Sequence, residues 1–365
     1  MISVTSSALP ELACEAGRAH WEQAVREALI DAFVSTMYGP APHATEVACR
    51  LTERREWAGL RGAQRLGLEV RIAIQKYSFP VSVALYLPPV ARVLPPLVLG
   101  PNFAGNASVD PDPAIPLDTG WMRDEPAWGM AGNRATPATR GIHQGRWPLA
   151  DILKRGYAAA VWYDGDICPD DPAICRPVLE AGFGGAIAAW AWGFSRVLDA
   201  VIPLGMVDSR RIAAVGHSRH GKAALWAAAN DRRLGLAVSN NSGAGGARLW
   251  RDAGGETIAD LFDRFPHWFA SPLKSFAGRE NALPFDQHQL LALAAPRAVL
   301  VASADDDAWA GPADERRAVE AARPAFALYG RAEALSWQHR PGGHGIGPAD
   351  WARFLDFADR VFAAN

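Results

Sequence analysis

The sequence lacks most of the features that would place it in a functional class at first sight. Its four cysteines, Cys14, Cys49, Cys168 and Cys175, form no C-x-x-C pair and have no zinc-ligand spacing. Cys168 and Cys175 flank a Pro-Asp-Asp-Pro loop, so a disulfide between them and two free thiols both stay open. Because His-Glu-x-x-His, phosphate-loop and dinucleotide patterns are also missing, we expect neither a metal nor a cofactor.

An excess of charge and long apolar runs are lacking too. The net charge of −2 gives no electrostatic reason to expect nucleic acid or an anionic membrane as a partner. No run approaches the roughly 18 apolar residues of a transmembrane helix. Residues 1–12 show no signal peptide, so we expect a cytoplasmic protein, or a secreted or periplasmic one whose leader has been removed. The oligomeric state is left open, with a monomer as the expectation.

The size and composition are those of an ordinary globular protein. Apolar residues make up 49% of the 365 and charged residues 21%, enough for one large α/β core. The 14 tryptophans suit an apolar or sugar-stacking cleft, although most belong in a core. We therefore expect a single domain over residues 1–365, with an N-terminal helix at 20–37 and a long loop excursion at 102–147.

Hydrophobic patterning predicts an α/β chain. Residues 68–74 and 81–87 alternate as strands near a sheet edge do, whereas 97–100 and 158–163 are continuously apolar, as central parallel strands are. Helices and strands then alternate, which predicts a mostly parallel central sheet flanked by helices, that is, a three-layer αβα sandwich. The expected helices are 183–201, 219–230, 286–294, 312–328 and 349–363, and the expected strands are 211–216, 235–240, 297–303 and 335–339.

One serine stands where a strand turns sharply into a helix. Residues 211–215 predict a buried strand and residues 223–229 an alanine-rich helix, with Gly216-His217-Ser218-Arg219-His220-Gly221 between them. This arrangement is typical of the nucleophile elbow of an α/β-hydrolase, although the second glycine comes one position later than in G-x-S-x-G. Ser218 is therefore the candidate nucleophile, and a helix N-cap serine is the alternative for the same position.

A nucleophilic serine needs a base and an acid that orients the base. In this fold the chain order is serine, acid, histidine. His344 lies in a glycine-rich loop directly after the last predicted strand, where the base belongs. The strand before it runs into Asp305, Asp306 and Asp307, and we select Asp307 because the acid usually stands about three residues beyond the last small residue, here Ala304. A solvated acidic turn accounts for at least two of these three aspartates.

With these residues in place, the chain resembles the glucuronoyl esterases, carbohydrate esterases that cleave lignin–glucuronoxylan esters. The similarity extends from about residue 95 to the C-terminus and depends on the order and spacing of several motifs. These motifs are Asn102-Phe103-Ala104-Gly105-Asn106, Ala191-Trp192-Gly193-Phe194-Ser195-Arg196, the serine elbow through Lys222, Asn240-Asn241-Ser242-Gly243-Ala244-Gly245-Gly246-Ala247, Phe265-Pro266-His267-Trp268-Phe269, Leu283-Pro284-Phe285-Asp286-Gln287-His288, Ala294-Ala295-Pro296-Arg297 and Asp307-Ala308-Trp309.

The resemblance implies a role for each matching site residue. The serine and histidine above would be nucleophile and base, and Arg219 would help to form the oxyanion hole. Lys222, one turn beyond the serine on the same helix face, would reach uronate hydroxyls with its ammonium group. Glu256 would bind paired sugar hydroxyls, and Trp309 would supply a flat wall with an indole N–H. Solvated side chains are the alternative for Arg219 and Lys222.

The chain departs from the family pattern at three positions. Where some relatives carry a glutamate as the acid this chain has Asn241, whose amide cannot stabilise an imidazolium by charge, so Asp307 is the acid that remains. Ala107 replaces a frequent histidine. His217 replaces a cysteine that forms a disulfide in fungal members, which is consistent with a bacterial-type member.

These observations predict a serine esterase that attacks the C6 carbonyl of a 4-O-methyl-D-glucuronoyl ester through an acyl-enzyme. Its expected partner is a glucuronate ester or a glucuronoxylan-derived substrate. Another carbohydrate or acetyl esterase is one alternative, although an acetyl group needs no uronate cradle. A catalytically silent carbohydrate-binding relative is the other. It predicts that Asp307 does not reach His344, whereas an active enzyme needs a hydrogen bond of about 2.6 to 3.2 Å there.

Overall fold

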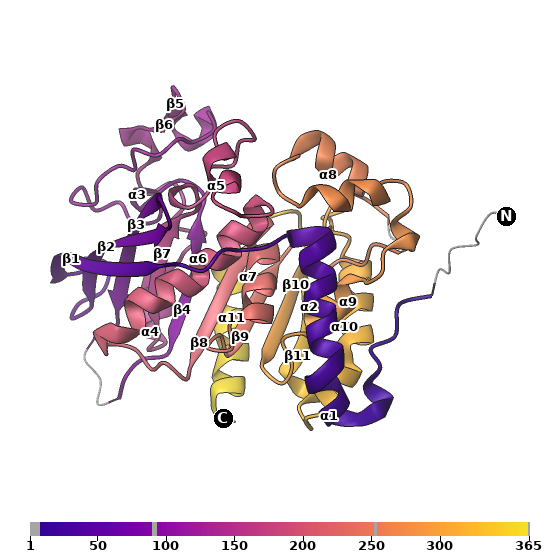
Figure 1. The fold of residues 1–365 in the computed structure, drawn as a ribbon. Coiled ribbons are helices and arrows are strands. Elements are labelled where there is room, and N and C mark those ends of the chain that lie inside the picture. The colour runs from indigo at the N-terminus through magenta and orange to yellow at the C-terminus, as the bar shows by residue number, and fades with distance from the viewer. Residues whose placement is uncertain (1–7, 90–92, 252–253, 364–365) are drawn as a thin grey trace. The chain divides into compact units, whose positions relative to one another are not determined.

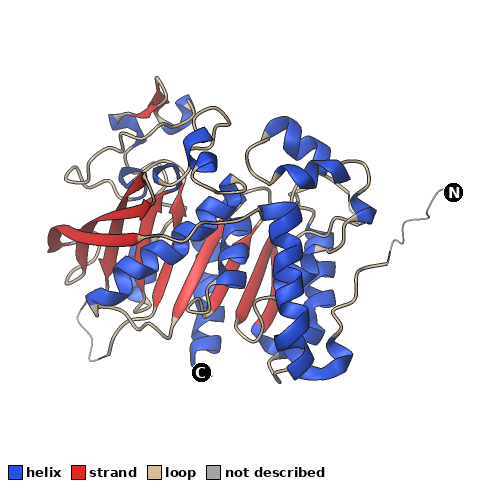
Figure 2. Ribbon diagram, viewed as in Figure 1, coloured by secondary structure: helices blue, strands red, loops and turns tan. Residues whose placement is uncertain are grey.

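The computed structural model describes residues 8–89, 93–251 and 254–363, so the first seven of residues 1–12, which show no signal-peptide pattern, lie outside it. The chain forms two compact units. Unit 1 consists of Met1–Pro40 and Val215–Gly345, and unit 2 of Ala41–Ala214 and Ile346–Asn365. Figure 1 labels their helices and strands, and Figure 2 colours them by type.

Unit 1 is built on parallel strands. Strand β10 (Ala298–Ala304) pairs in parallel with β9 (Leu236–Asn240) on one side and β11 (Leu335–Arg340) on the other. Strands β9 and β10 are buried along their whole length, which is consistent with their mostly apolar sequences. Helix α7 (Arg219–Asn230) packs on β9, α10 (Pro312–Ala327) packs on β10 and β11, and α9 (Gln287–Ala292) packs against both helices (Figure 1).

The predicted N-terminal helix forms in unit 1 as a helical run that includes α1 (Gly17–His20) and α2 (Arg26–Phe33) and ends at Tyr38. The Phe33 ring lies 4.1 Å from that of Phe285, measured between ring centroids. The Tyr38 hydroxyl donates to the carbonyl oxygen of Gly245 at 3.0 Å. These contacts hold the run against the rest of the unit.

Unit 2 contains both antiparallel and parallel strand pairs. Strand β3 pairs in antiparallel fashion with β2 and β7, whereas β4 pairs in parallel with β7 and with the first half of β8. Helix α6 packs on β1, β2 and β4, and α4 packs on β3 and β7. The bounds are β1 (Glu46–Glu56), β2 (Gln64–Ile74), β3 (Tyr77–Leu87), β4 (Leu97–Asn102), β5 (Met130–Ala131), β6 (Arg134–Ala135), β7 (Ala158–Tyr163), β8 (Ile212–His217), α3 (Asn106–Val109), α4 (Leu149–Lys154), α5 (Arg176–Glu180), α6 (Ala186–Val201) and α11 (Pro348–Ala363).

The helices and strands predicted beyond residue 180 all form, with ends within three residues of those expected. Strand β1 was not predicted. Its 11 residues carry charges on both faces and are almost all exposed, so they show no apolar alternation. The strand pairs with β2 alone, and charged side chains on such an edge discourage pairing with another chain. The excursion at 102–147 is less irregular than expected, because it contains α3, the β5–β6 pair and short 3₁₀ turns.

Two further features of unit 2 bear on the sequence expectations. Among the residues that the structure describes, one helix, Ala186–Leu204, is long and apolar enough to cross a membrane, but 67% of its most apolar window is buried within the protein, as in the core helix of a globular fold. Cys168 and Cys175 are buried and form no disulfide. The exposed Cys49 and the half-buried Cys14 are free thiols as well.

Candidate active site

The carboxyl ends of three strands bring the candidate catalytic residues of unit 1 together. Ser218 follows β8, and its backbone N–H donates to the carbonyl of Asn240, the last residue of β9, at 2.9 Å. The N–H of Asn241 donates in turn to the carbonyl of Ala302 in β10 at 2.7 Å. The loops that leave these strands therefore begin at the same edge, where ligands bind in open α/β sheets.

Ser218 occupies a strained elbow. Its φ of 58° and ψ of −125° lie outside the regions that ordinary residues populate, at a cost of about 1–3 kcal/mol. A Cβ at Gly216 would lie 2.0 Å from the carbonyl oxygen of His220, and one at Gly221 would lie 2.9 Å from Cβ of Ser242. Both glycines of the motif are therefore required, including the one that comes a position late. Ser218 is the N-cap residue of α7, as the alternative expected, but its side chain makes no capping hydrogen bond to the helix.

Asp307 and His344 form a hydrogen-bonded pair. His344 Nδ1 lies 2.6 Å from Asp307 Oδ2, and the Asp307 side chain is 2% exposed against 46% for His344. Burial alone would raise the pKa of Asp307. The hydrogen bond and charge of His344, with an N–H donated by Ala310 to Oδ1 at 3.1 Å, outweigh that effect and hold this pKa below its usual value. The carboxylate therefore stays ionised beside the imidazole.

The register of two strands explains why these loops meet. The last pair of β10 and β11 is Ala304 with Arg340, so both strands end at one level. Asp307 lies three residues beyond β10 and His344 four residues beyond β11. The N–H groups of the two intervening aspartates donate to the carbonyls of Arg340 and Gly342 at 2.9 and 3.0 Å, which ties the loops together.

The other two aspartates of the turn are exposed. Asp305 Oδ1 lies 2.7 Å from Nδ1 of His339, in a pair whose side chains are 44% and 53% exposed. The ring of His217 lies beside that of His344, with 4.7 Å between centroids, and its Nδ1 lies 2.7 Å from Oδ1 of Asn240. A histidine thus stands against the base where fungal relatives were expected to carry a disulfide.

Ser218, Asp307 and His344 line one cavity of about 280 Å³. Lys222 also lines it and is fully buried, and its Nζ donates to the carbonyls of Ser242 and Ala244 at 2.6 and 2.5 Å. Burial lowers the pKa of Lys222 to about 8. Its ammonium group is therefore not a solvated surface charge. Two of its three N–H donors bind these carbonyls, and the third can donate to a ligand.

Glu256 and Trp309 line the cavity as well, on either side of an arginine. Arg264 Nη1 lies 3.5 Å from Glu256 Oε1, and its guanidinium carbon lies 4.8 Å from the centroid of the Trp309 ring. The Trp309 side chain is 54% exposed, so one wall of the cavity is an open indole face. Arg219, by contrast, is the half-buried first residue of α7 and is not among the described residues that line the cavity.

Sequence reasoning missed Arg264 and a buried carboxylate beneath the site. Glu315 of α10 is fully buried and accepts hydrogen bonds from the N–H of Gly243 at 2.9 Å and from Ser303 Oγ at 2.5 Å. Burial raises its pKa to about 7. Glu315 therefore holds the loop whose carbonyls bind Lys222. The helical spacing of Glu315 with the buried Ala318, Val319 and Ala322 would have placed it on the core face.

Within the described ranges, no group of three or more His, Cys, Asp or Glu side chains is placed to hold a metal ion. What the cavity does offer is a strained serine, a carboxylate–imidazole pair, a buried ammonium group and an exposed indole. Together these groups are able to attack a carbonyl, move a proton and hold a hydroxylated ring.

Comparison with known proteins places these residues in context. A family model of fungal glucuronyl esterases matches residues 181–330. A carbohydrate esterase from an unknown prokaryotic organism is 35% identical over 367 residues, which cover 93% of this chain and 84% of the relative.

Two solved structures share the fold closely. A promiscuous family 15 carbohydrate esterase from a marine bacterial metagenome has a TM-score of 0.91 at 32% identity and covers 98% of both chains. A glucuronoyl esterase from Solibacter usitatus has a TM-score of 0.88 at 32% identity, over 99% of this chain and 100% of its own. The predicted α/β-hydrolase fold is confirmed by these structures and by the mostly parallel strands described above.

Proposed function

The chain belongs to the glucuronoyl esterases, a family of carboxylic ester hydrolases, and from this we propose that it hydrolyses esters of D-glucuronate and 4-O-methyl-D-glucuronate at C6. The observation that carries the proposal is the 2.6 Å contact between His344 and Asp307 in the cavity that Ser218 lines. This distance lies in the range that an active enzyme requires. It argues against a catalytically silent relative.

The reaction proceeds in two halves. Ser218 Oγ attacks the C6 carbonyl carbon while His344 Nε2 takes the hydroxyl proton, and the ionised Asp307 stabilises the imidazolium. When the tetrahedral intermediate collapses, the ester bond breaks and the alcohol leaves with the proton from His344. Water then attacks the acyl-enzyme, again with His344 as base, which releases the glucuronate and regenerates Ser218.

The remaining residues would bind the sugar and the developing oxyanion. The backbone N–H that follows the nucleophile, at Arg219, faces the oxyanion in this fold, and the Arg219 guanidinium would add positive charge. Lys222 and Glu256 would donate to and accept from the sugar hydroxyls, and the open face of Trp309 would pack on the ring. An acetyl ester would leave these three groups without a partner.

Hydrolysis of benzyl and methyl D-glucuronate by the purified protein tests the proposal, with Ser218→Ala and an acetyl ester as controls. We expect turnover of the glucuronate esters, lost in Ser218→Ala. Absence of turnover for every ester would refute the proposal.

A second candidate function is hydrolysis of other esters. The structural neighbour from the marine metagenome is described as promiscuous. The half-exposed His344 and the exposed Trp309 leave part of the cavity open to solvent, where esters of other shapes could be accommodated. Turnover of the acetyl ester at a rate equal to that of the glucuronate esters would favour this broader activity.

A further inference from the structure

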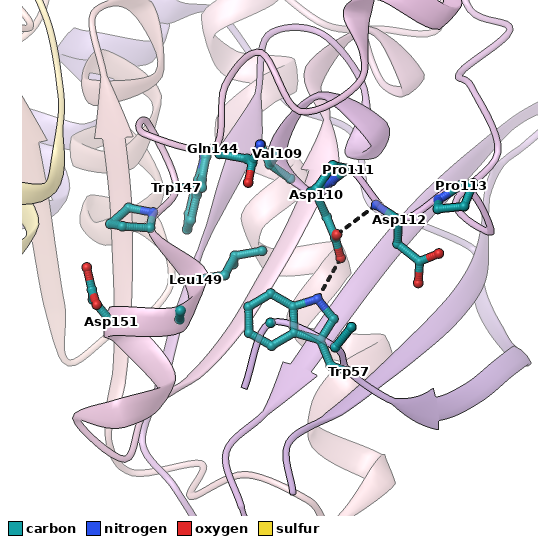
Figure 3. Close-up of a pocket in the computed structure, with 14 residues that line it drawn as sticks. Trp57, Val109, Asp110, Pro111, Asp112, Pro113, Gln144, Trp147, Leu149 and Asp151 are labelled. Carbon is teal, nitrogen blue, oxygen red and sulfur yellow. Dashed lines mark hydrogen bonds between the residues drawn. The ribbon is translucent and has the colours of Figure 1, made fainter. Parts of the chain in front are cut away.

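Unit 2 contains a second cavity that the esterase reaction does not use. Its volume is about 630 Å³, within the range of about 300–1,000 Å³ that is usual for small-molecule sites. Three chain segments form it: the turn between β1 and β2, the segment that follows α3, and the start of α4 (Figure 3).

The floor of this cavity is apolar and held rigidly. Trp57, Trp147 and Leu149 are all more than nine-tenths buried and line the space. The indole N–H of Trp57 donates to Asp110 Oδ2 at 2.8 Å, which fixes that ring (Figure 3). The Trp147 ring packs against Trp351, with 4.9 Å between centroids. Among the described residues none accepts a hydrogen bond from the Trp147 indole N–H, which is therefore available to a ligand in the cavity.

Hydrogen-bonding groups surround the floor. Figure 3 shows Gln144 and Asp151 on different sides of the two indoles, whereas the Asp112 carboxylate points away from them and pairs with Arg65 at 3.1 Å. Gln144 and Asp151 are exposed, and Asp151 makes one long contact, 3.4 Å, with Lys154. A ligand that satisfies groups on several sides needs hydroxyls around its whole edge, which a phenol with a single hydroxyl does not have.

The charge of the lining selects against anions. Its fourteen residues include three carboxylates, Asp110, Asp112 and Asp151, and no Lys, Arg or His among the described residues that line it; Asp112 is paired with Arg65 behind the lining, at 3.1 Å. A uronate would meet like charge there. The Ser218 cavity differs, because the cations Lys222 and Arg264 line it beside the carboxylates Glu256 and Asp307.

From the apolar floor, the polar groups at its rim and a lining that holds carboxylates but no cation, we infer that this cavity binds a neutral pyranose. The C–H faces of such a ring pack on the indoles, and its equatorial hydroxyls reach the rim. The site takes uncharged sugar units, whereas the Ser218 cavity is proposed to take the glucuronoyl unit. It does not depend on the esterase activity.

The test measures binding of xylotriose to the full chain by titration calorimetry and saturation-transfer NMR, with glucuronic acid and phenol as comparison ligands. Gln144→Ala combined with Asp151→Asn removes exposed rim groups, and Trp147→Phe removes the indole N–H while it keeps a ring. The matched controls are Gln23→Ala with Asp31→Asn, which are exposed positions in unit 1.

We expect xylotriose to bind, and its Kd to rise about tenfold or more in the rim and Trp147 variants but not in the controls. Hydrolysis of methyl glucuronate should stay within about twofold of wild type in every variant. The inference is overturned if xylotriose does not bind, if all variants bind it equally, or if glucuronic acid or phenol binds at this site as tightly as xylotriose does. Because esterase activity is measured separately, failure of this site and failure of the proposed function are distinguishable.

Discussion

Replacement of Asp307 by asparagine is the sharpest test of the proposed catalytic machinery. Asp307 Oδ1 accepts the N–H of Ala310 and Oδ2 accepts from His344 Nδ1. An asparagine that keeps its oxygen on Ala310 turns its NH₂ group toward His344. The imidazole must then accept at Nδ1 and carry its proton on Nε2, where it can no longer remove the proton of Ser218.

The magnitude follows from the lost charge. Two unit charges about 4 Å apart interact by about 4 kcal/mol at the effective dielectric constant of about 20 that suits protein sites. At about 1.36 kcal/mol for each factor of ten, this lowers kcat about 10³-fold. The wrong tautomer adds to the loss, and the same substitution in a serine protease lowers kcat about 10⁴-fold. We expect kcat for methyl glucuronate to fall between these limits, with a nearly unchanged KM.

Asp305→Asn is the matched control. Asp305 pairs with His339 at 2.7 Å, close to the 2.6 Å of the Asp307 pair, but in an exposed setting where such pairs contribute little. Its kcat should remain within about twofold of wild type. Retention of more than about a tenth of the activity in Asp307→Asn, or an equal loss in Asp305→Asn, would refute Asp307 as the acid. In the Asp307→Asn background, Asn241→Glu should restore part of kcat, because position 241 lines the same cavity.

Three other predictions follow from the buried groups and the exposed indole. The KM of wild type should increase above pH 8, because burial lowers the pKa of Lys222 to about 8 and its charged donor is lost above that pH. A pH profile of KM checks this. Lys222→Met should have a KM raised about tenfold or more and no such pH dependence. The pKa of Glu315 in the folded protein, about 7, lies above its value in the unfolded chain. The free energy of unfolding should therefore fall by on the order of 2–3 kcal/mol as the pH rises from 5 to 8. Urea titrations across this range should find no such pH dependence in Glu315→Gln. Trp309→Ala should raise KM several-fold, about two- to tenfold, at constant kcat, with Trp309→Phe in between; equal kinetics in all three proteins would exclude the indole as a sugar wall.

Local sequence patterns were sufficient to predict many of the strands and helices of this protein. The continuous apolar runs of β4, β7 and β10 and the elbow around Ser218 depend on residues adjacent in sequence, and the structure contains all of them. Strand β1 shows the limit of this approach. Its side chains carry charge on both faces, and only its pairing with β2 makes it a strand.

The site shows the same division. The sequence alone determined the α/β alternation, the serine at its strained turn and the histidine in the last loop, because glycine requirements and hydrophobic period are local properties. Tertiary structure decided which aspartate reaches His344, since the register of β10 with β11 places Asp307 inward and leaves Asp305 exposed. It also decided that Lys222 is held by two carbonyls over the buried Glu315. Those contacts join residues far apart in the chain, and their energies exist only once the strands have paired.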